Sequence, residues 1–148
     1  MTRIANKYLL KLPSETDNLE IIREVVSKVA SKVGFTTDDV SKIELAVDEA
    51  CTNVIKHAYD GNSKNYIEVE IEIENNKFTV IVTDRGKGFN PKRIKVPDMK
   101  EYLEEMRVGG LGIYLMESLM DKVDFKIKPG VKNQVKLIKY LEKNKSQN

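Results

Sequence analysis

The chain has 148 residues and a net charge of +2 at neutral pH, with 41% hydrophobic and 32% charged residues. This balance is typical of one globular domain, and it favours neither nucleic acid nor a membrane as the main partner. Its single Cys and single His cannot form an internal disulfide or a zinc cage. We therefore expect a cytoplasmic protein with one domain over residues 1–142 and a polar tail over residues 143–148.

The first part of the chain predicts a strand followed by a helix. Apolar and basic residues from Ile4 to Leu12 end at a proline, which predicts a first strand at the edge of a sheet. Apolar residues then recur at helical spacing from Leu19 to Val33, with Ser14 as the expected N-cap and Gly34 as the expected end.

A second helix and a β-hairpin follow. Residues 37–58 predict the helix, which the Asp-Gly turn at residues 60–61 closes. Isoleucine and valine alternate with glutamate from Ile67 to Glu74, as in a half-buried strand with an acidic outer face. The Asn-Asn turn at residues 75–76 leads to a partner strand that ends at Asp84.

The last part of the chain predicts a long loop, a third helix and two more strands. The loop covers residues 86–108 with one short helix, and a loop of this length is more often functional than incidental. The third helix is expected over residues 110–121, and the strands over 123–127 and 135–141. The order of elements predicts an α+β fold, a two-layer sandwich with a mixed, mostly antiparallel sheet and helices on one face.

The second predicted helix carries an acid and an amide opposite its apolar residues. Glu49 and Asn53 stand one helical turn apart and can reach the same small volume. A carboxylate there could take a proton from a nucleophile, and an amide oxygen could ligate Mg²⁺. The commoner explanation of such a face is simple solvation. However, Thr52 and Asn53 suit a helix interior poorly, because both compete with the backbone for hydrogen bonds.

Three neighbours of this pair are given structural roles. Asp48 points away from Glu49, and we interpret it as a surface charge. Cys51 lies on the apolar side, where a core thiol is far more common than a nucleophile. His57 is expected to interact with the C-terminal dipole of the helix rather than to act as a base.

Asp84 ends a strand and opens the first glycine turn of the chain. Gly86 and Gly88 allow the backbone to approach a flat ligand closely. An Asp at this position can accept a hydrogen bond from an exocyclic amine such as adenine N6. A plain Asp-x-Gly turn is the alternative, and it is the commoner explanation of this motif alone.

The second glycine turn, Gly109-Gly110-Leu111-Gly112, runs directly into the third helix. Such a turn presents unpaired N–H groups and the positive end of the helix dipole, which suit a phosphate. It is neither a Walker A loop nor a Rossmann fingerprint. Arg107 could add a contact to the terminal phosphate, although a solvated loop arginine is an equally good explanation.

The order of the three motifs resembles that of the Bergerat-fold (GHKL) ATPases and kinases, in which a helix-borne N box precedes two glycine boxes. Within that superfamily, residues 49–58 and 109–116 look like those of the bacterial anti-sigma factor serine/threonine kinases. The resemblance extends over nearly the whole chain, from the first strand to about Leu141. It implies the Bergerat ATP-binding fold and a cytoplasmic, Mg²⁺- and ATP-dependent kinase.

The resemblance also implies roles for individual residues. Glu49 matches the general base of the family, and Asn53 matches its Mg²⁺ ligand. Asp84 matches the adenine-reading Asp, with Gly86 and Gly88 shaping the base pocket.

In the same way, Gly110 and Gly112 match the phosphate-binding turn, and residues 89–108 match the lid over the nucleotide. Kinases of this family phosphorylate a serine on an anti-sigma factor antagonist, hold a sigma factor inactive, and act as homodimers. The resemblance therefore implies an anti-sigma factor that is also a protein serine kinase.

One departure from the family concerns the last strand, where relatives often have Gly-Thr near the adenine. Here the aligned residues 132–135 read Lys-Asn-Gln-Val, and Asn133 could supply a polar contact instead. Two alternatives remain open. The first is a nucleotide-gated switch that captures a protein without modifying it. The second is a detached histidine-kinase catalytic domain, which the short chain makes less favoured.

Overall fold

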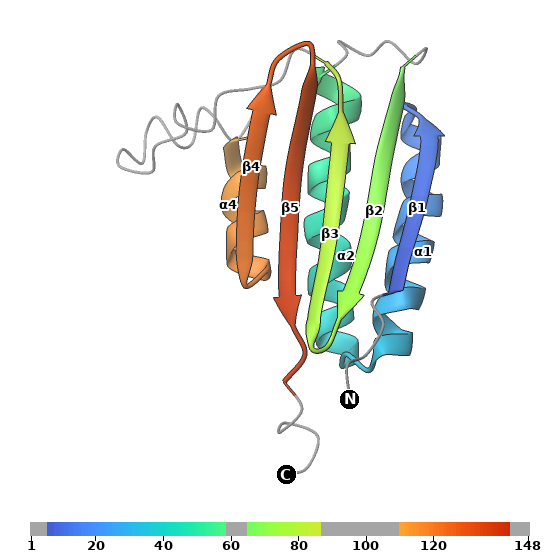
Figure 1. The fold of residues 1–148 in the computed structure, drawn as a ribbon, viewed down its shortest axis with the longest axis vertical. Helices are drawn as coiled ribbons and strands as arrows, with labels where there is room; N and C mark the ends of the chain where they lie inside the picture. The colour runs from blue at the N-terminus through green and yellow to red at the C-terminus, as the bar shows by residue number, and fades with distance from the viewer. Residues whose placement is uncertain (1–5, 59–64, 87–109, 143–148) are drawn as a thin grey trace.

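A five-stranded sheet lies over three helices in the computed structural model, which describes residues 6–58, 65–86 and 110–142 (Figure 1). The strand order is β1-β2-β3-β5-β4, and all four pairings are antiparallel. The strands are β1 (Asn6–Pro13), β2 (Tyr66–Glu74), β3 (Lys77–Asp84), β4 (Lys122–Lys128) and β5 (Lys132–Tyr140). The predicted α+β two-layer fold, with its helices on one face, is confirmed.

The helices are α1 (Leu19–Val33), α2 (Thr37–Asn53) and α4 (Gly110–Leu119), with a short 3₁₀ turn η1 (Thr16–Asn18) and a π-helical turn η2 (Val54–Ala58). In Figure 1, the helices α1, α2 and α4 lie behind the sheet as seen by the viewer. No helix in the described part of the chain has the length and apolar character needed to cross a bilayer.

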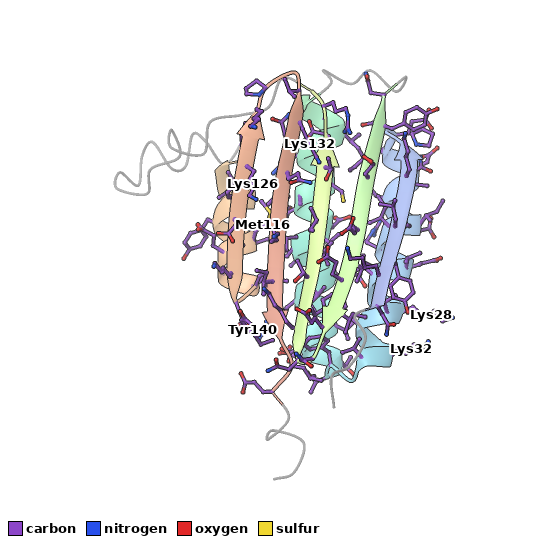
Figure 2. All side chains as sticks on the ribbon, in the orientation of Figure 1. Lys28, Lys32, Met116, Lys126, Lys132 and Tyr140 are labelled. Atoms are coloured by element: carbon purple, nitrogen blue, oxygen red, sulfur yellow. The ribbon has the colours of Figure 1, made fainter. Side chains whose placement is uncertain are left out.

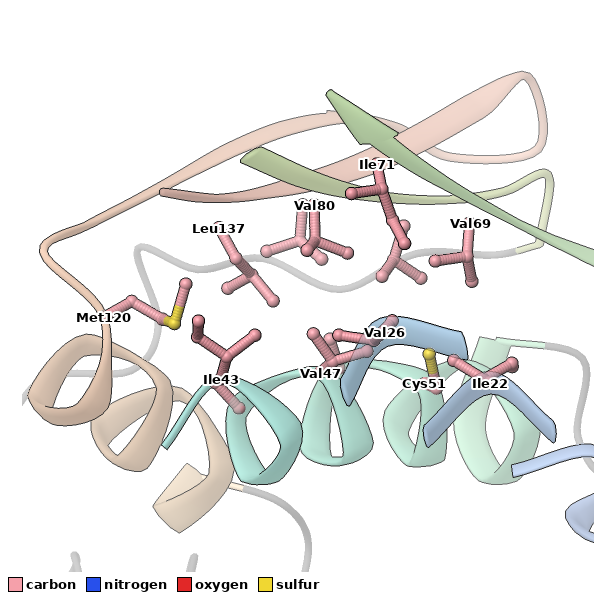
Figure 3. Packing of buried hydrophobic residues seen from close by; sticks show 14 of the residues in the cluster. Ile22, Val26, Ile43, Val47, Cys51, Val69, Ile71, Val80, Met120 and Leu137 are labelled. Carbon is pink, nitrogen blue, oxygen red and sulfur yellow. The ribbon is translucent and has the colours of Figure 1, made fainter. Parts of the chain in front are cut away.

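Strand alternation produces the core that joins the two layers. The isoleucine and valine side chains of β2 point toward the helices, whereas its glutamates point away. Val80 of β3 lies between Ile71 of β2 and Leu137 of β5 in the register, and all three are fully buried. Figure 3 shows these side chains facing Ile43 and Val47 of α2. This packing fixes α2 against the middle of the sheet.

The opposite face of the sheet carries polar and charged side chains, among them Lys126 and Lys132 (Figure 2). β1 is an edge strand, as the sequence predicts. Asn75 makes the tight turn between β2 and β3 with a φ of 55°, a conformation that Asn tolerates better than most residues.

The N-cap of α1 differs from the prediction. Ser14 is not the N-cap of α1, because the η1 turn intervenes and Asn18 occupies that position. Ser14 is instead buried after β1, where its N–H donates to the Asn65 carbonyl at 2.8 Å. The helix α2 begins at Thr37, as predicted, and the hydroxyl of its N-cap Thr36 accepts the Asp39 N–H at 3.1 Å. The end of α1 at Gly34, with a φ of 118°, is confirmed.

Candidate functional site

The predicted acid and amide of α2 lie against the first turn of α4. Gly112 is buried there, and a Cβ built on it would stand 2.7 Å from Glu49 Oε2 and 3.4 Å from Asn53 Nδ2. Two segments nearly sixty residues apart in sequence are therefore in contact through a position where only a hydrogen occupies the space. A Cβ at residue 112 would displace the Glu49 carboxylate, so glycine lets this carboxylate keep its observed position.

Helix geometry explains why both α2 side chains reach this point. Residues at i and i+4 stand one above the other on a helix, so Glu49 and Asn53 project to the same side. Both are half-buried rather than solvated, because α4 covers part of this face. The explanation of this face as simply solvated is therefore wrong for this pair, although Lys56 in the following turn is exposed.

The helix changes its winding directly after Asn53. Residues Val54–Ala58 form a π-helical turn, whose hydrogen bonds skip one more residue than those of an α-helix. Such turns are rare and are frequently found at functional sites. Here the regular α-helix ends at Asn53, the residue predicted to bind Mg²⁺.

Asp84 lies at the end of β3 and is buried. Its Oδ1 accepts two hydrogen bonds, from the Gly86 N–H at 2.8 Å and from Asn133 Nδ2 at 2.9 Å. The Asp-x-Gly turn is thus present. A plain turn, however, does not require a second donor from another strand. Both hydrogen bonds of the Asp84 carboxylate among the described residues are to Oδ1, and none is to Oδ2.

Asn133 was expected as a polar contact to the base, but the structure joins it to the protein instead. Its Nδ2 donates to Asp84 Oδ1 and to the Gly86 carbonyl, both at 2.9 Å, and its Oδ1 accepts the Lys128 N–H at 3.1 Å. The β3–β5 register explains the contact, because Asn133 is the direct partner of Asp84. The sequence does not reveal which strand pairs with β3, so this link could not be predicted.

Two neighbours on α2 take the places that their surroundings dictate. Cys51 is fully buried, which confirms the prediction of a core thiol, and burial raises the pKa of this thiol, with a smaller contribution from the Asp48 carboxylate. Asp48 is not an isolated surface charge: its Oδ1 lies 3.3 Å from Arg23 Nε on α1. The side chain of His57 lies outside the described residues.

Several predicted site residues also lie outside the described residues: Gly88, Arg107, Gly109 and the lid over residues 89–108. Gly110 and Leu111 belong to the first turn of α4, so the second glycine motif does open a helix, as predicted. The ends of α2 and β3 and the beginning of α4 lie toward the same end of the molecule (Figure 1). The described parts of the first and third motifs are thus in contact at Gly112, and Asp84 lies toward the same end of the molecule (Figure 1).

The histidine kinase-like ATPase domain family matches residues 12–139. This chain belongs to that family. Use of ATP by such a domain agrees with the glycine turns of the sequence and with the side-chain oxygens of Glu49 and Asn53 at the end of α2.

Curated relatives carry the name serine-protein kinase RsbW. The protein of Bacillus velezensis is 38% identical over 137 residues, which cover 89% of this chain and 84% of the relative. The protein of Bacillus subtilis is 36% identical over 146 residues, covering 95% and 89%. That of Staphylococcus aureus is 35% identical over 144 residues, covering 94% and 89%.

Solved structures share the fold at low identity. The RsbU and RsbW domains of Rv1364c from Mycobacterium tuberculosis match with a TM-score of 0.67 and 17% identity, over 92% of this chain and 32% of that chain. The SiaB–SiaC complex from Pseudomonas aeruginosa matches with a TM-score of 0.65 and 12% identity, over 88% of each chain. At these identities the likeness establishes the architecture alone.

Proposed function

We propose that this protein is an ATP-dependent protein serine kinase and an anti-sigma factor. It phosphorylates a serine on an anti-sigma factor antagonist and sequesters a sigma factor. The observation that carries the proposal is the contact of Glu49 and Asn53 with Gly112, which brings an acid and an amide to a glycine-rich helix start. The names of the curated relatives support the same reaction.

In this proposal Glu49 is the general base. Glu49 is half-buried on α2. Its carboxylate would accept the proton of a serine hydroxyl as that oxygen bonds to the terminal phosphorus of ATP, while the bond from this phosphorus to the bridging oxygen breaks and ADP leaves. The N–H groups of the glycine turn at Gly109–Gly112 would hold the phosphates, with Arg107 as an added charge. Their fixed dipoles would stabilise charge as it moves during transfer.

The residues present fit a magnesium ion. Asn53 offers a side-chain amide oxygen, a hard donor of the kind that Mg²⁺ prefers, from a half-buried position on α2. We assign Asn53 as the protein ligand. When bound, the ion would neutralise negative charge on the nucleotide phosphates.

The adenine ring would lie at the end of the nucleotide away from Glu49. In the proposal, Asp84 Oδ2 would accept a hydrogen bond from the adenine amine, and Gly86 and Gly88 would shape the pocket around the ring. The lid over residues 89–108 would cover the bound nucleotide. We further propose that the domain spans residues 1–142 and that residues 143–148 form a tail.

The partners in this proposal are proteins. The curated relatives are named serine-protein kinases, which supports a protein, here an anti-sigma factor antagonist, as the substrate. We propose a sigma factor as the second partner, a homodimer as the working form and the cytoplasm as the location. Direct contact with nucleic acid or a membrane is not part of the proposal.

The test separates chemistry from binding. Glu49→Ala should retain ATP affinity, measured by calorimetry, but should not transfer labelled phosphate to an antagonist protein. Asn53→Ala should lose the Mg²⁺-dependent part of nucleotide affinity. Glu117→Ala is the matched control, because this glutamate is exposed on α4 and should affect neither measurement. Undiminished transfer by Glu49→Ala would refute the proposed base.

Asn133 in place of the usual Thr keeps a second function open, that of a nucleotide-gated switch without transfer. A switch would bind its partner only with nucleotide and leave no phosphoserine. The stability of the phosphorylated product in acid separates serine phosphorylation from a histidine kinase.

A further inference from the structure

A buried hydrogen-bond network ties the turn after β3 to the β4–β5 hairpin. We propose that Asn133 is the positioning residue of the base subsite, holding the Asp84 carboxylate so that one oxygen alone faces a purine amine. This inference rests on the proposed use of ATP. It concerns selection of the base, and Asn133 itself would not touch the nucleotide.

The hydrogen-bonding capacity of Asn133 supports a role within the protein. An amide has two N–H donors, and here one meets Asp84 Oδ1 and the other the Gly86 carbonyl, each at 2.9 Å. Its carbonyl oxygen accepts the Lys128 N–H at 3.1 Å. With 3% of its surface exposed, Asn133 has no free donor to offer a base.

The consequence for Asp84 is an asymmetric carboxylate. Two donors, the Gly86 N–H and Asn133 Nδ2, converge on Oδ1 and fix the plane of the group. An ionised carboxylate is an acceptor only, so Oδ2 can pair with an amine such as adenine N6 but not with the carbonyl oxygen of a 6-oxo purine. Loss of the Asn133 donor would leave the group free to rotate, and the geometry of selection would relax.

The hairpin makes the arrangement rigid. Gly130, at the tip of the β4–β5 turn, has a φ of 77° and donates its N–H to the Gly86 carbonyl at 2.7 Å. That carbonyl therefore receives two donors, one from the backbone and one from Asn133. The base subsite is thus built on three strands, because Asp84 ends β3, Asn133 lies in β5 and Lys128 ends β4.

The test measures selectivity rather than affinity alone. Calorimetry with Mg²⁺ gives the affinities of wild type and Asn133→Ala for ATP, GTP and inorganic tripolyphosphate, which has no base. We expect Asn133→Ala to bind ATP about tenfold more weakly, because the donor that orients the Asp84 carboxylate is lost. The affinity for tripolyphosphate should be unchanged, and the ratio of ATP affinity to GTP affinity should fall. The control Gln134→Ala removes a side chain that bonds Thr83 Oγ1 at 3.2 Å on the other face, and it should retain the ratio.

Two further variants keep the inference testable if the alanine variant does not fold. Asn133→Thr retains one donor, so its ratio of ATP affinity to GTP affinity should exceed that of Asn133→Ala. If the alanine variant does not fold, the ratio for Asn133→Thr should stay within about threefold of the wild-type ratio. Asn133→Asp should lose selectivity at pH 8 and recover part of it at pH 5, where a protonated carboxyl can donate to Asp84.

The outcomes distinguish this inference from the proposed function. Wild type that binds no adenine nucleotide overturns both. Wild type that binds ATP, with an unchanged ATP-to-GTP ratio in Asn133→Ala, overturns the positioning role alone. An equal loss for ATP and tripolyphosphate also overturns it, because that pattern indicates general damage to the site.

Discussion

Replacing Gly112 by alanine should separate the stability of the fold from its activity. The added Cβ would stand 2.7 Å from Glu49 Oε2, and ordinary contact begins at 3.4 Å, so the carboxylate must retreat by about 0.7 Å. The atom that moves is the end of a flexible side chain, so the backbone need not shift. Gly112 does not have a positive φ, and alanine is the better helix former by up to about 1 kcal/mol. We therefore expect the melting temperature to stay constant or to rise.

Activity should respond in the opposite direction. A misplacement of about 1 Å in a catalytic group can cost about 100-fold in rate. For a displacement of about 0.7 Å we expect phosphate transfer to fall between about tenfold and 100-fold, equivalent to roughly 1.4–2.7 kcal/mol of activation free energy. Asn53 Nδ2 stands 3.4 Å from the added carbon, at ordinary contact, so Mg²⁺-dependent nucleotide affinity should change by less than about threefold.

The assay pairs thermal unfolding with single-turnover transfer of labelled phosphate to an antagonist protein. Ser118→Ala is the matched control, since it also raises helix propensity in α4 but alters an exposed serine that bonds the Leu115 carbonyl at 2.9 Å. The control should transfer phosphate at the wild-type rate. Full activity in Gly112→Ala would show that Glu49 does not act from the position seen here. A large fall in melting temperature would contradict the expected side-chain retreat.

Three further predictions concern stability and the thiol. Phe78→Ala should lower the unfolding free energy by about 3–5 kcal/mol in denaturant titration. Phe78 is fully buried and packs edge-on against Phe35, with 5.4 Å between the ring centroids. Burial raises the pKa of the Cys51 thiol, so this thiol should resist a thiol reagent at pH 8 in the native protein and react after unfolding. The hydrogen bond to Glu72 raises the pKa of Glu70, so folding favours its protonated form. Glu70→Gln should melt higher at neutral pH, and its advantage should shrink as pH falls toward the ordinary carboxyl value of 4.5.

Local patterns were sufficient to predict most of the fold. Period-2 alternation located β2, and helical spacing located α1 up to Gly34. The error fell at the start of α1, where two polar residues, Ser14 and Asn18, could both serve as N-cap. Ser14 has the right chemistry for an N-cap, but the chain inserts the turn η1 before α1 and buries this serine. A cap depends on where the backbone turns, and residue type alone does not decide that.

The candidate site divides in the same way. Residue type and spacing identified Glu49 and Asn53, because an i, i+4 pair is a property of one helix. Their contact with Gly112 was not predicted, since no local rule brings α4 onto α2. Asn133 was considered only as a polar contact to the adenine, and its bond to Asp84 was not foreseen. Its bond to Asp84 depends on the pairing of β5 with β3, and that pairing is set by the whole sheet.

The two ends of the candidate site are built from different layers, and this separation has consequences for function. The acid and amide belong to helices, with α4 packed on α2, whereas the base subsite belongs to three strands joined by Asn133 and Gly130. Helices slide against one another more readily than paired strands do, because side-chain contacts join them rather than a ladder of backbone hydrogen bonds. A movement of α4 can therefore change the surroundings of Glu49 while the residues proposed to bind adenine stay in place. Substitutions at Gly112 should consequently alter the rate of phosphate transfer without altering selectivity for adenine. Substitutions at Asn133 should alter selectivity for adenine without altering the rate of phosphate transfer at saturating ATP.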